Sequence, residues 1–317
     1  MMRVLLTGGS GMLGRALRRA AADAAPDIRL LAPTRAELPL TDRAAVAAWL
    51  AANPVDAVIH AAARVGGIQA NIDDPSGFLT DNLRMNDAVI TGAHAAGVPR
   101  LVFLGSSCMY PRDWRQPLVE EDILAGPLEP TNEGYALAKI AGARLCDYVS
   151  RQSPGRAYRT VLPCNLFGID DHFGSAAAHL LAAAVTKIVD AQDQGHGSVE
   201  IWGTGRARRE FLDVDHLAPF ILTLLPRLAN LPPLLNVGAE ADHSVNDYYR
   251  MVADRAGWQG RFTHDLSRPE GMAAKLMSSG RARACGWVPP DRAALSASIG
   301  RAVAAYRARK AAPQPAN

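Results

Sequence analysis

The chain has 317 residues, of which 49% are hydrophobic and 21% charged, and its formal net charge is +3. This length and apolar fraction allow a large buried core divided between two lobes. No apolar run is long enough to cross a bilayer, and the small charge surplus is spread along the chain, so we expect neither a membrane nor a nucleic-acid partner. Because residues 1–3 lead directly into a strand rather than a signal peptide, we also expect a cytoplasmic protein.

The four cysteines lie far apart in the sequence. They stand at positions 108, 146, 164 and 285, and none forms a Cys-x-x-Cys pair. The sequence therefore predicts neither a metal site nor a disulfide framework.

A glycine-rich turn follows the first predicted strand. Residues 3–7 are apolar, Gly-Gly-Ser-Gly-Met-Leu-Gly comes next, and the residues after it have the pattern of a helix. Gly8 permits the tight turn, Gly11 lets the backbone approach a pyrophosphate, and Gly14 allows the helix to pack closely. The order of strand, turn and helix predicts a dinucleotide site that begins with Gly8, Ser10, Gly11, Met12 and Leu13.

The second predicted strand, residues 28–32, indicates which dinucleotide binds. It is followed by Pro33, Thr34 and Arg35 rather than by an acidic residue. An acid here would accept a hydrogen bond from a ribose 2′-hydroxyl, whereas Arg35 can pair with a 2′-phosphate. The sequence therefore favours NADP(H), and the alternative is that Arg35 only covers a solvent-exposed loop.

Strands and helices continue to alternate along the chain. Apolar strands are predicted at residues 57–61, 101–105 and 159–163, with helices around residues 82–96 and from residue 133 onward. This alternation is typical of α/β proteins and predicts a Rossmann-type, doubly wound parallel sheet.

The end of the 101–105 strand and the next helix carry a candidate proton-transfer set. Ser106 follows the strand directly, and ligands of open parallel sheets bind at that end. Tyr135 and Lys139 share one helix face, so we expect the lysine charge to lower the pKa of the phenol from its usual value of about 10. The three residues predict protonation of the alkoxide formed when a carbonyl is reduced. The alternatives are that Ser106 only ends the strand and that Tyr135 and Lys139 are an ordinary pair on a helix.

Four further polar residues are candidates. Cys108 is either a proton-transfer group or a buried small hydrophobe. His179, at the start of a predicted helix over residues 179–190, is either its acid–base partner or a structural histidine. Lys187 lies two turns later on the same helix face. Arg209 can grip a diphosphate through both arms of its guanidinium, although cationic side chains usually sit in solvent.

After Gly168 the alternation becomes irregular. A strand is predicted at residues 199–202, and the chain returns to the sheet at residues 220–225 and 234–238. The irregular part and the C-terminal part together predict a smaller mixed α/β substrate lobe over the strand ends.

The expected domain boundaries follow from this pattern. We expect a dinucleotide-binding domain of residues 1–168 plus about 212–238 and a substrate lobe of residues about 169–211 plus 239–310. Residues 311–317 are expected to form a disordered tail.

Four segments resemble one known family. They are residues 62–68, 104–111, 128–142 and 209–215. With the glycine turn and the Tyr-x-x-x-Lys pair, they are similar to the GDP-L-fucose synthase family of the extended short-chain dehydrogenase/reductase superfamily, over nearly the whole chain. The resemblance implies a homodimeric enzyme that takes GDP-4-keto-6-deoxy-D-mannose, epimerises it at C3 and C5, and reduces C4 with NADP(H).

The resemblance also implies roles for the matched residues. Ser106, Tyr135 and Lys139 would reduce the 4-keto group, and Cys108 and His179 would be the base and acid of epimerisation. Besides the glycine turn and Arg35, the residues expected to bind the cofactor are Ala62, Lys139, Pro163, Asn165, Leu166 and His179. The residues expected to bind the nucleotide-diphosphate sugar are Ser107, Asn165, Lys187, Trp202 and Arg209.

Three departures from the family bear on the cofactor, at Ser10, and on the substrate, at the other positions. Ser10 and Lys187 stand where the family has arginines, and residues 270–278 lack the arginine and the last aspartate of the family's Asp-Gly-Thr-Pro-Arg-Lys-Leu-Leu-Asp. Two alternatives therefore remain: a related nucleotide-sugar 4-reductase or epimerase with a different sugar or base, and a non-catalytic NADP-binding sensor.

Overall fold

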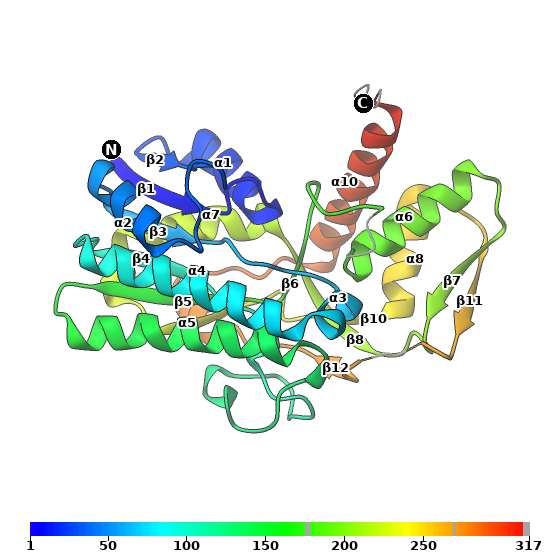
Figure 1. Ribbon diagram of the computed structural model, residues 1–317. Helices are drawn as coiled ribbons and strands as arrows, with labels where there is room; N and C mark the ends of the chain where they lie inside the picture. The colour runs from blue at the N-terminus through cyan, green and yellow to red at the C-terminus, as the bar shows by residue number, and fades with distance from the viewer. Residues whose placement is uncertain (175–177, 269–270, 313–317) are drawn as a thin grey trace.

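A parallel sheet of six strands is the centre of the computed structural model, which describes residues 1–174, 178–268 and 271–312 (Figure 1). Every pair of neighbouring strands is parallel. The chain proceeds from β1 to β2 in one direction and from β3 onward in the other, which is the doubly wound arrangement and confirms the predicted fold class. In spatial order the strands are β2 (Ile28–Leu31), β1 (Met2–Thr7), β3 (Ala57–His60), β4 (Arg100–Leu104), β5 (Ala157–Pro163) and β9 (Leu234–Val237).

Helices cover both faces of this sheet (Figure 1). On one face α1 (Met12–Ala24) packs against α7 (Val214–Leu224). On the other, α4 (Pro75–Ala95) contacts both α2 (Arg43–Ala52) and α5 (Glu133–Gln152). The inner strands are apolar and buried on both sides, so helices on both faces are needed to keep them from water.

Two predicted elements differ from the structure. We expected residues 220–225 to form a strand of the sheet, and this prediction is wrong. Most of these residues belong to α7, and the rest begin the 3₁₀ helix η4 (Leu225–Asn230). The Asp213 carboxylate caps α7 by accepting from the Asp215 N–H at 2.9 Å, and the apolar side chains before residue 220 continue the helical repeat. Helix α4 begins at Pro75, earlier than expected, because Asp74 caps it through the Gly77 N–H at 2.9 Å.

Smaller sheets lie beyond the carboxyl ends of the large one. Strand β8 (Arg208–Asp213) pairs with β6 (Asn165–Phe167), β10 (Asp242–Ser244) and β12 (Ala274–Lys275), and β7 (Ser198–Trp202) pairs with β11 (Arg261–Asp265). The helices of this part are α6 (Leu180–Asp193), α8 (Val245–Ala256) and α10 (Arg292–Ala311). The remaining short helices are α3 (Ile68–Asp73), α9 (Gly280–Ala284), η1 (Ser107–Met109), η2 (Glu120–Asp122) and η3 (Pro130–Asn132).

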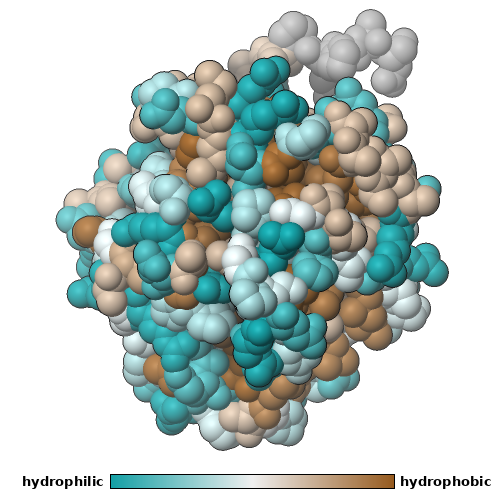
Figure 2. All heavy atoms as spheres, turned by 90° about the vertical axis from the view of Figure 1, so that its left-hand side faces the viewer, coloured by the Kyte–Doolittle hydropathy of each residue, from teal (hydrophilic) through white to brown (hydrophobic). Residues whose placement is uncertain are grey.

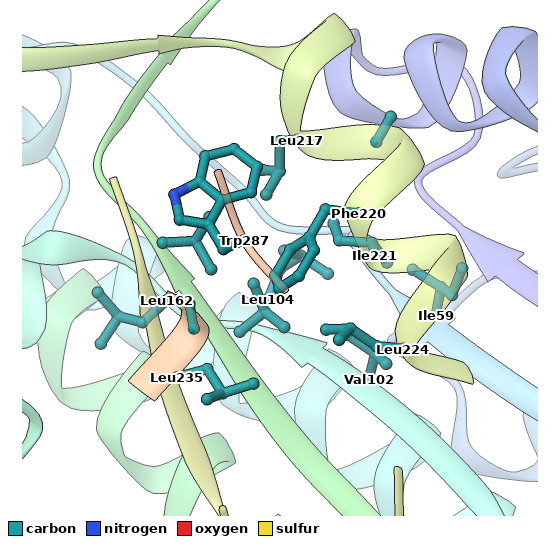
Figure 3. Close-up of a cluster of buried hydrophobic side chains, with 14 of the residues drawn as sticks. Ile59, Val102, Leu104, Leu162, Leu217, Phe220, Ile221, Leu224, Leu235 and Trp287 are labelled. Atoms are coloured by element: carbon teal, nitrogen blue, oxygen red, sulfur yellow. The ribbon is translucent and has the colours of Figure 1, made fainter. Parts of the chain in front are cut away.

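Hydrophobic side chains gather in separate clusters on the two sides of the molecule. One cluster joins α6, α8 and α10, and two others fill the faces of the large sheet. Trp287, from the C-terminal part of the chain, packs on the large sheet with its ring centroid 5.1 Å from that of Phe220 (Figure 3). We propose that the molecule is divided into the two lobes expected from the sequence, and the separate hydrophobic clusters support this division. Trp287 would connect the two lobes by packing on the large sheet.

The surface and the C-terminus complete the description. Helix α10 extends to Ala311, one residue into the expected tail, and residues 313–317 lie outside the described part. Hydrophilic and hydrophobic residues are interspersed over the face seen in Figure 2. Among the described residues, no helix has the length and apolarity needed to cross a membrane.

Candidate active site

A large cleft runs along the carboxyl ends of the parallel strands. Its volume is about 1510 Å³, well above the ~300–1,000 Å³ of a pocket for one small molecule. It therefore has room for a dinucleotide and a nucleotide sugar together. The cleft is lined by every site residue proposed from the sequence: Gly8, Ser10, Gly11, Met12, Leu13, Arg35, Ala62, Ser106, Ser107, Cys108, Tyr135, Lys139, Pro163, Asn165, Leu166, His179, Lys187, Trp202 and Arg209.

The glycine turn has the shape that a pyrophosphate requires. Gly8 has a φ of +74°, in the left-handed region that favours glycine. A Cβ on Gly14 would lie 2.1 Å from the Gly8 carbonyl oxygen, so only glycine permits this close approach of turn and helix. Helix α1 begins after Gly11, which has no side chain that could cap the helix. The first N–H groups of α1 can therefore bind phosphate oxygens. These residues fit a dinucleotide.

Arg35 lies after β2, at the position that distinguishes a 2′-hydroxyl from a 2′-phosphate on the adenosine ribose of such a dinucleotide. Its side chain is exposed and lines the cleft. The nearest acid in sequence, Glu37, accepts a hydrogen bond from the Thr34 N–H at 2.7 Å, and this contact holds its pKa below the ordinary value. A carboxylate engaged with its own turn is a poor acceptor for a ribose hydroxyl, so the local arrangement favours a 2′-phosphate on Arg35.

Ser106, Tyr135 and Lys139 meet at the end of β4. The hydroxyls of Ser106 and Tyr135 are hydrogen bonded to each other. Lys139 is buried, its Nζ donates to the Leu104 carbonyl oxygen at 2.7 Å, and it lies 5.8 Å from the centre of the Tyr135 ring. The arrangement suits proton donation to a carbonyl oxygen held beside Ser106.

The acidity expected for Tyr135 is wrong for this structure. Burial raises the pKa of the Tyr135 phenol well above 10, and the Cys108 thiol adds to this, while only the Ser106 hydrogen bond opposes it. Burial also lowers the pKa of Lys139 from 10.5 to about 7. The sequence argument treated the lysine as a permanent cation, but a buried amine is only partly charged at neutral pH. Tyr135 is therefore a neutral hydrogen-bond and proton donor.

Cys108 lies within the same hydrogen-bonded group. Its backbone N–H donates to Ser106 Oγ at 3.3 Å, and its Sγ accepts from the Asn132 side-chain amide at 3.3 Å. Asn132 also lines the cleft and was not among the residues proposed from the sequence. Asn132 immediately precedes α5 and lies inside the segment 128–142 that resembles the family. This position could have identified Asn132 as a site residue from the sequence.

His179 and Lys187 line the same cleft from the beginning and the middle of α6. His179 is the exposed N-cap residue of α6, so it stands just before the helix rather than within its first turn. Lys187 Nζ donates to the Glu200 carbonyl oxygen at 2.9 Å and lies 5.2 Å from the centre of the Trp202 indole. The Arg268 guanidinium also lies over this indole, at 4.8 Å. Cations therefore surround an aromatic side chain at the mouth of the cleft.

Arg209 and Lys275 form a second cationic group. They are direct neighbours on the parallel strands β8 and β12, and both line the cleft. Lys275 is 9% exposed, so its stem is buried while its end reaches the cleft. Lys275 was not proposed from the sequence, although it lies in the 270–278 segment compared with the family. The pairing across two strands could not be seen without the fold.

The fold and this site define a class of protein. A doubly wound sheet with a glycine turn, and a serine, a tyrosine and a lysine in the same cleft, are the parts of a nucleotide-dependent oxidoreductase of the Rossmann type. The cationic groups across the cleft indicate an anionic substrate.

Comparison with known proteins agrees with this class. The model of the NAD dependent epimerase/dehydratase family matches residues 4–238. The chain is 45% identical to a GDP-L-fucose synthase of Azorhizobium caulinodans over 287 residues, covering 90% of this chain and 91% of that protein. It is 41% identical to a GDP-L-colitose synthase of Yersinia pseudotuberculosis over 286 residues, covering 90% and 92%. The chain belongs to the NAD dependent epimerase/dehydratase family, in the group of the GDP-L-fucose synthases.

A solved structure agrees in fold and in chemistry. It is that of a GDP-mannoheptose C4 reductase from Campylobacter jejuni with NADP bound. The TM-score is 0.84 at 28% identity, with 96% of this chain and 98% of that chain covered. The likeness therefore extends over nearly the whole of both chains.

Proposed function

We propose that this chain is an NADP(H)-dependent epimerase and reductase that converts GDP-4-keto-6-deoxy-D-mannose into GDP-L-fucose. One group of contacts carries this proposal: the Ser106 hydroxyl bonds to the Tyr135 phenol and accepts from the Cys108 N–H. A proton donor for reduction and a thiol for removal of a C–H proton therefore flank one point of the cleft. The names of the relatives supply the sugar and the base.

The epimerisation uses the acidity of carbon atoms beside a ketone. The 4-keto group acidifies the hydrogens on C3 and C5, so the Cys108 thiolate removes a proton and leaves an enolate. His179 returns a proton to the opposite face of the same carbon, which inverts it. Asn132 holds the sulfur through its amide N–H and orients it toward the sugar. Ser106 donates its hydroxyl to the enolate oxygen.

The reduction follows at C4 in the same cleft. Bound NADPH supplies the hydride. Tyr135 gives its proton to the oxygen at C4, and Ser106 holds that oxygen beside the phenol. Lys139 donates to the Leu104 carbonyl oxygen and lies 5.8 Å from the centre of the Tyr135 ring, so it ties α5 to the end of β4 beside the phenol.

The cationic side chains bind the nucleotide part of the substrate. Arg209 and Lys275, side by side on two strands, suit the two phosphate groups of the diphosphate. Lys187 and Trp202, at the cleft mouth, suit the rest of the nucleotide sugar. The cofactor would be held by the glycine turn and by Arg35, with the other residues proposed from the sequence along the cleft wall.

A second candidate is a related GDP-4-keto-sugar. A relative of 41% identity is a GDP-L-colitose synthase, and this chain departs from the GDP-L-fucose synthase pattern at Lys187 and Ser278. A different sugar in the same cleft would use the same thiol, histidine and tyrosine.

The test is an assay of the purified chain with a panel of nucleotide 4-keto-sugars. We expect oxidation of NADPH, followed by the nicotinamide absorbance, to be fastest with GDP-4-keto-6-deoxy-D-mannose and slower with NADH. In heavy water the product should carry deuterium at C3 and C5. Tight NADPH binding without oxidation by any member of the panel would contradict the proposal and indicate a sensor.

The variant Cys108→Ser separates the two half-reactions. Because serine is a far weaker base than a thiolate, deuterium uptake at C3 and C5 should fall by about 10²-fold or more. Reduction of a substrate that is already epimerised should continue, since Tyr135 is unchanged. Cys285→Ser, at a free cysteine of similar exposure away from the cleft, is the matched control. Retention of both activities in Cys108→Ser would exclude the thiol as the base.

We also place the chain in the cytoplasm as a homodimer formed through α4 and α5. These neighbouring helices carry exposed apolar side chains, namely Leu83, Leu137 and Tyr148. Light scattering should give twice the chain mass of 33.8 kDa, and the double variant Leu83→Glu with Leu137→Glu should give the single mass. Val288→Glu, at a residue exposed elsewhere, should leave the dimer intact. A wild-type chain that is monomeric would contradict this assembly.

A further inference from the structure

Glu210 has no part in the chemistry described above, yet it is the most deeply buried acid near the cleft. Its side chain is 0% exposed. It follows Arg209 on β8, and side chains alternate along a strand, so Arg209 faces the cleft while Glu210 points away from it. A carboxylate is costly to bury and needs strong hydrogen bonds in return.

The hydrogen bonds of Glu210 come from two distant segments of the chain. Oε1 accepts from the Glu240 N–H at 2.7 Å, and the Ala239 N–H also bonds to the carboxylate. Oε2 accepts from the Met277 N–H at 3.0 Å. A Cβ on Gly238 would lie 2.2 Å from Oε1, so any larger residue there would push the carboxylate out of its present position. One side chain therefore joins β8 to the loop after β9 and to the segment after β12.

The surroundings reinforce this junction. Glu240 in turn accepts from the Ser279 N–H at 3.0 Å and pairs with Arg283 at 2.6 Å. The Ser279 hydroxyl accepts from the Gly238 N–H at 2.8 Å. Burial, with a smaller contribution from Glu240, raises the pKa of Glu210 to about 7, and the backbone donors oppose that shift. The loop and the segment are thus held together as one unit around the carboxylate.

This unit determines where the cationic pair stands. Met277 is two residues beyond Lys275, so the bond from Met277 to Glu210 holds β12 in register against β8. The backbone of β8 is itself fixed, because Tyr248 donates to the Arg209 carbonyl oxygen at 2.9 Å and Asn165 to that of Glu210 at 2.9 Å. Leu276 and Ser278 are also bonded to Leu118, each at 2.8 Å, so loss of the Glu210 contact would leave β8 in place and loosen β12, which carries Lys275, against it.

We propose that Glu210 is a positioning residue for the diphosphate site: its carboxylate anchors β12 so that Lys275 stands beside Arg209 and the two present their charges to a nucleoside diphosphate. The inference rests on the proposed function for the identity of the ligand. Its test uses GDP alone, so it does not depend on turnover of any sugar.

The test is titration calorimetry of the full chain with GDP and, separately, with NADPH. In Glu210→Gln an amide replaces the carboxylate and brings N–H groups against backbone N–H groups, so GDP affinity should fall by about 10-fold or more. NADPH affinity should stay within about two-fold, because the glycine turn is not touched. Glu120→Gln is the matched control: Glu120 is also buried and accepts a backbone N–H, that of Asn236, but lies away from the cleft.

A double-mutant cycle distinguishes positioning from general stabilisation. If Glu210 acts through Lys275, Glu210→Gln should weaken GDP binding much less in a Lys275→Met background than in the wild type. Additive effects in that cycle, an equal loss of GDP and NADPH affinity, or wild-type GDP binding in Glu210→Gln would each overturn the proposal.

A measurement on the wild-type chain covers the case in which Glu210→Gln does not fold. GDP should slow hydrogen exchange in peptides that contain residues 238–240 and 276–279, because a ligand bound by Arg209 and Lys275 stabilises the unit around Glu210. Unchanged exchange in both peptides at saturating GDP would contradict the proposed coupling. Slowed exchange together with normal NADPH protection of the glycine turn would support it.

Discussion

Replacement of Tyr135 by phenylalanine is expected to lower the rate of 4-keto reduction by about 10³-fold. The phenol is hydrogen bonded to the Ser106 hydroxyl, and the ring without its own hydroxyl has no proton to give to the oxygen at C4. Deuterium uptake at C3 and C5 should continue, because Cys108 and His179 are unchanged. The measurement is NADPH oxidation in single turnovers, with product deuteration read by mass spectrometry.

Tyr148→Phe is the matched control for this variant. Tyr148 is on the same helix, α5, but its side chain is 47% exposed and lies away from the cleft. It should reduce substrate at the wild-type rate. Reduction by Tyr135→Phe at a similar rate would show that another group, or water, donates the proton.

Replacement of Lys139 by methionine is expected to stabilise the chain in the absence of ligands while it impairs reduction. Burial lowers the pKa of Lys139 from 10.5 to about 7, so below pH 7 the folded chain holds a buried charge that the unfolded chain exposes to water. This difference costs about 5 kcal/mol of folding free energy. Methionine has similar length and no charge, and it loses the hydrogen bond to Leu104, worth about 1 kcal/mol, together with the contact of the ammonium with the Phe103 ring at 4.9 Å.

The sign of the pH dependence makes this prediction specific. The unfolded chain binds the extra proton between about pH 7 and 10.5, so the cost of Lys139 is full below pH 7 and fades as the pH rises toward 10.5. Denaturant unfolding at pH 6 and at pH 9 should therefore show a larger gain for Lys139→Met at pH 6. A gain that is equal at both values, or a loss at pH 6, would mean that the buried amine is not depressed in pKa.

The fold was largely predictable because its signals are local. The glycine turn, the alternation of apolar runs and the Tyr-x-x-x-Lys spacing each lie within a few residues of one another, and the sheet and α5 follow from them. The segment 220–225 was not predictable in the same way. A short apolar run suits a buried strand or a buried helix equally, and only the cap at Asp213 and the packing on α1 select the helix.

The residues that line the cleft were predictable from the sequence, whereas the electrostatics of the cleft were not. Every proposed residue lines the cleft, because the carboxyl ends of parallel strands converge. The pKa values of Tyr135 and Lys139 depend on burial, which a sequence does not show, and the expected acidification was wrong. Asn132 was missed because its contact with the Cys108 sulfur is made across 24 positions of the chain.

The sequence by itself determined the class of fold and the glycine-rich turn, and it selected residues that all line one cleft, since these depend on residue type and short spacing. The tertiary structure alone decided which charges stand together and how strongly they are held. Lys275 meets Arg209 because β12 pairs with β8, and Met277, just after β12, donates to the buried carboxylate of Glu210. Such contacts join segments more than 60 residues apart, so their energies come from packing and desolvation rather than from any local pattern.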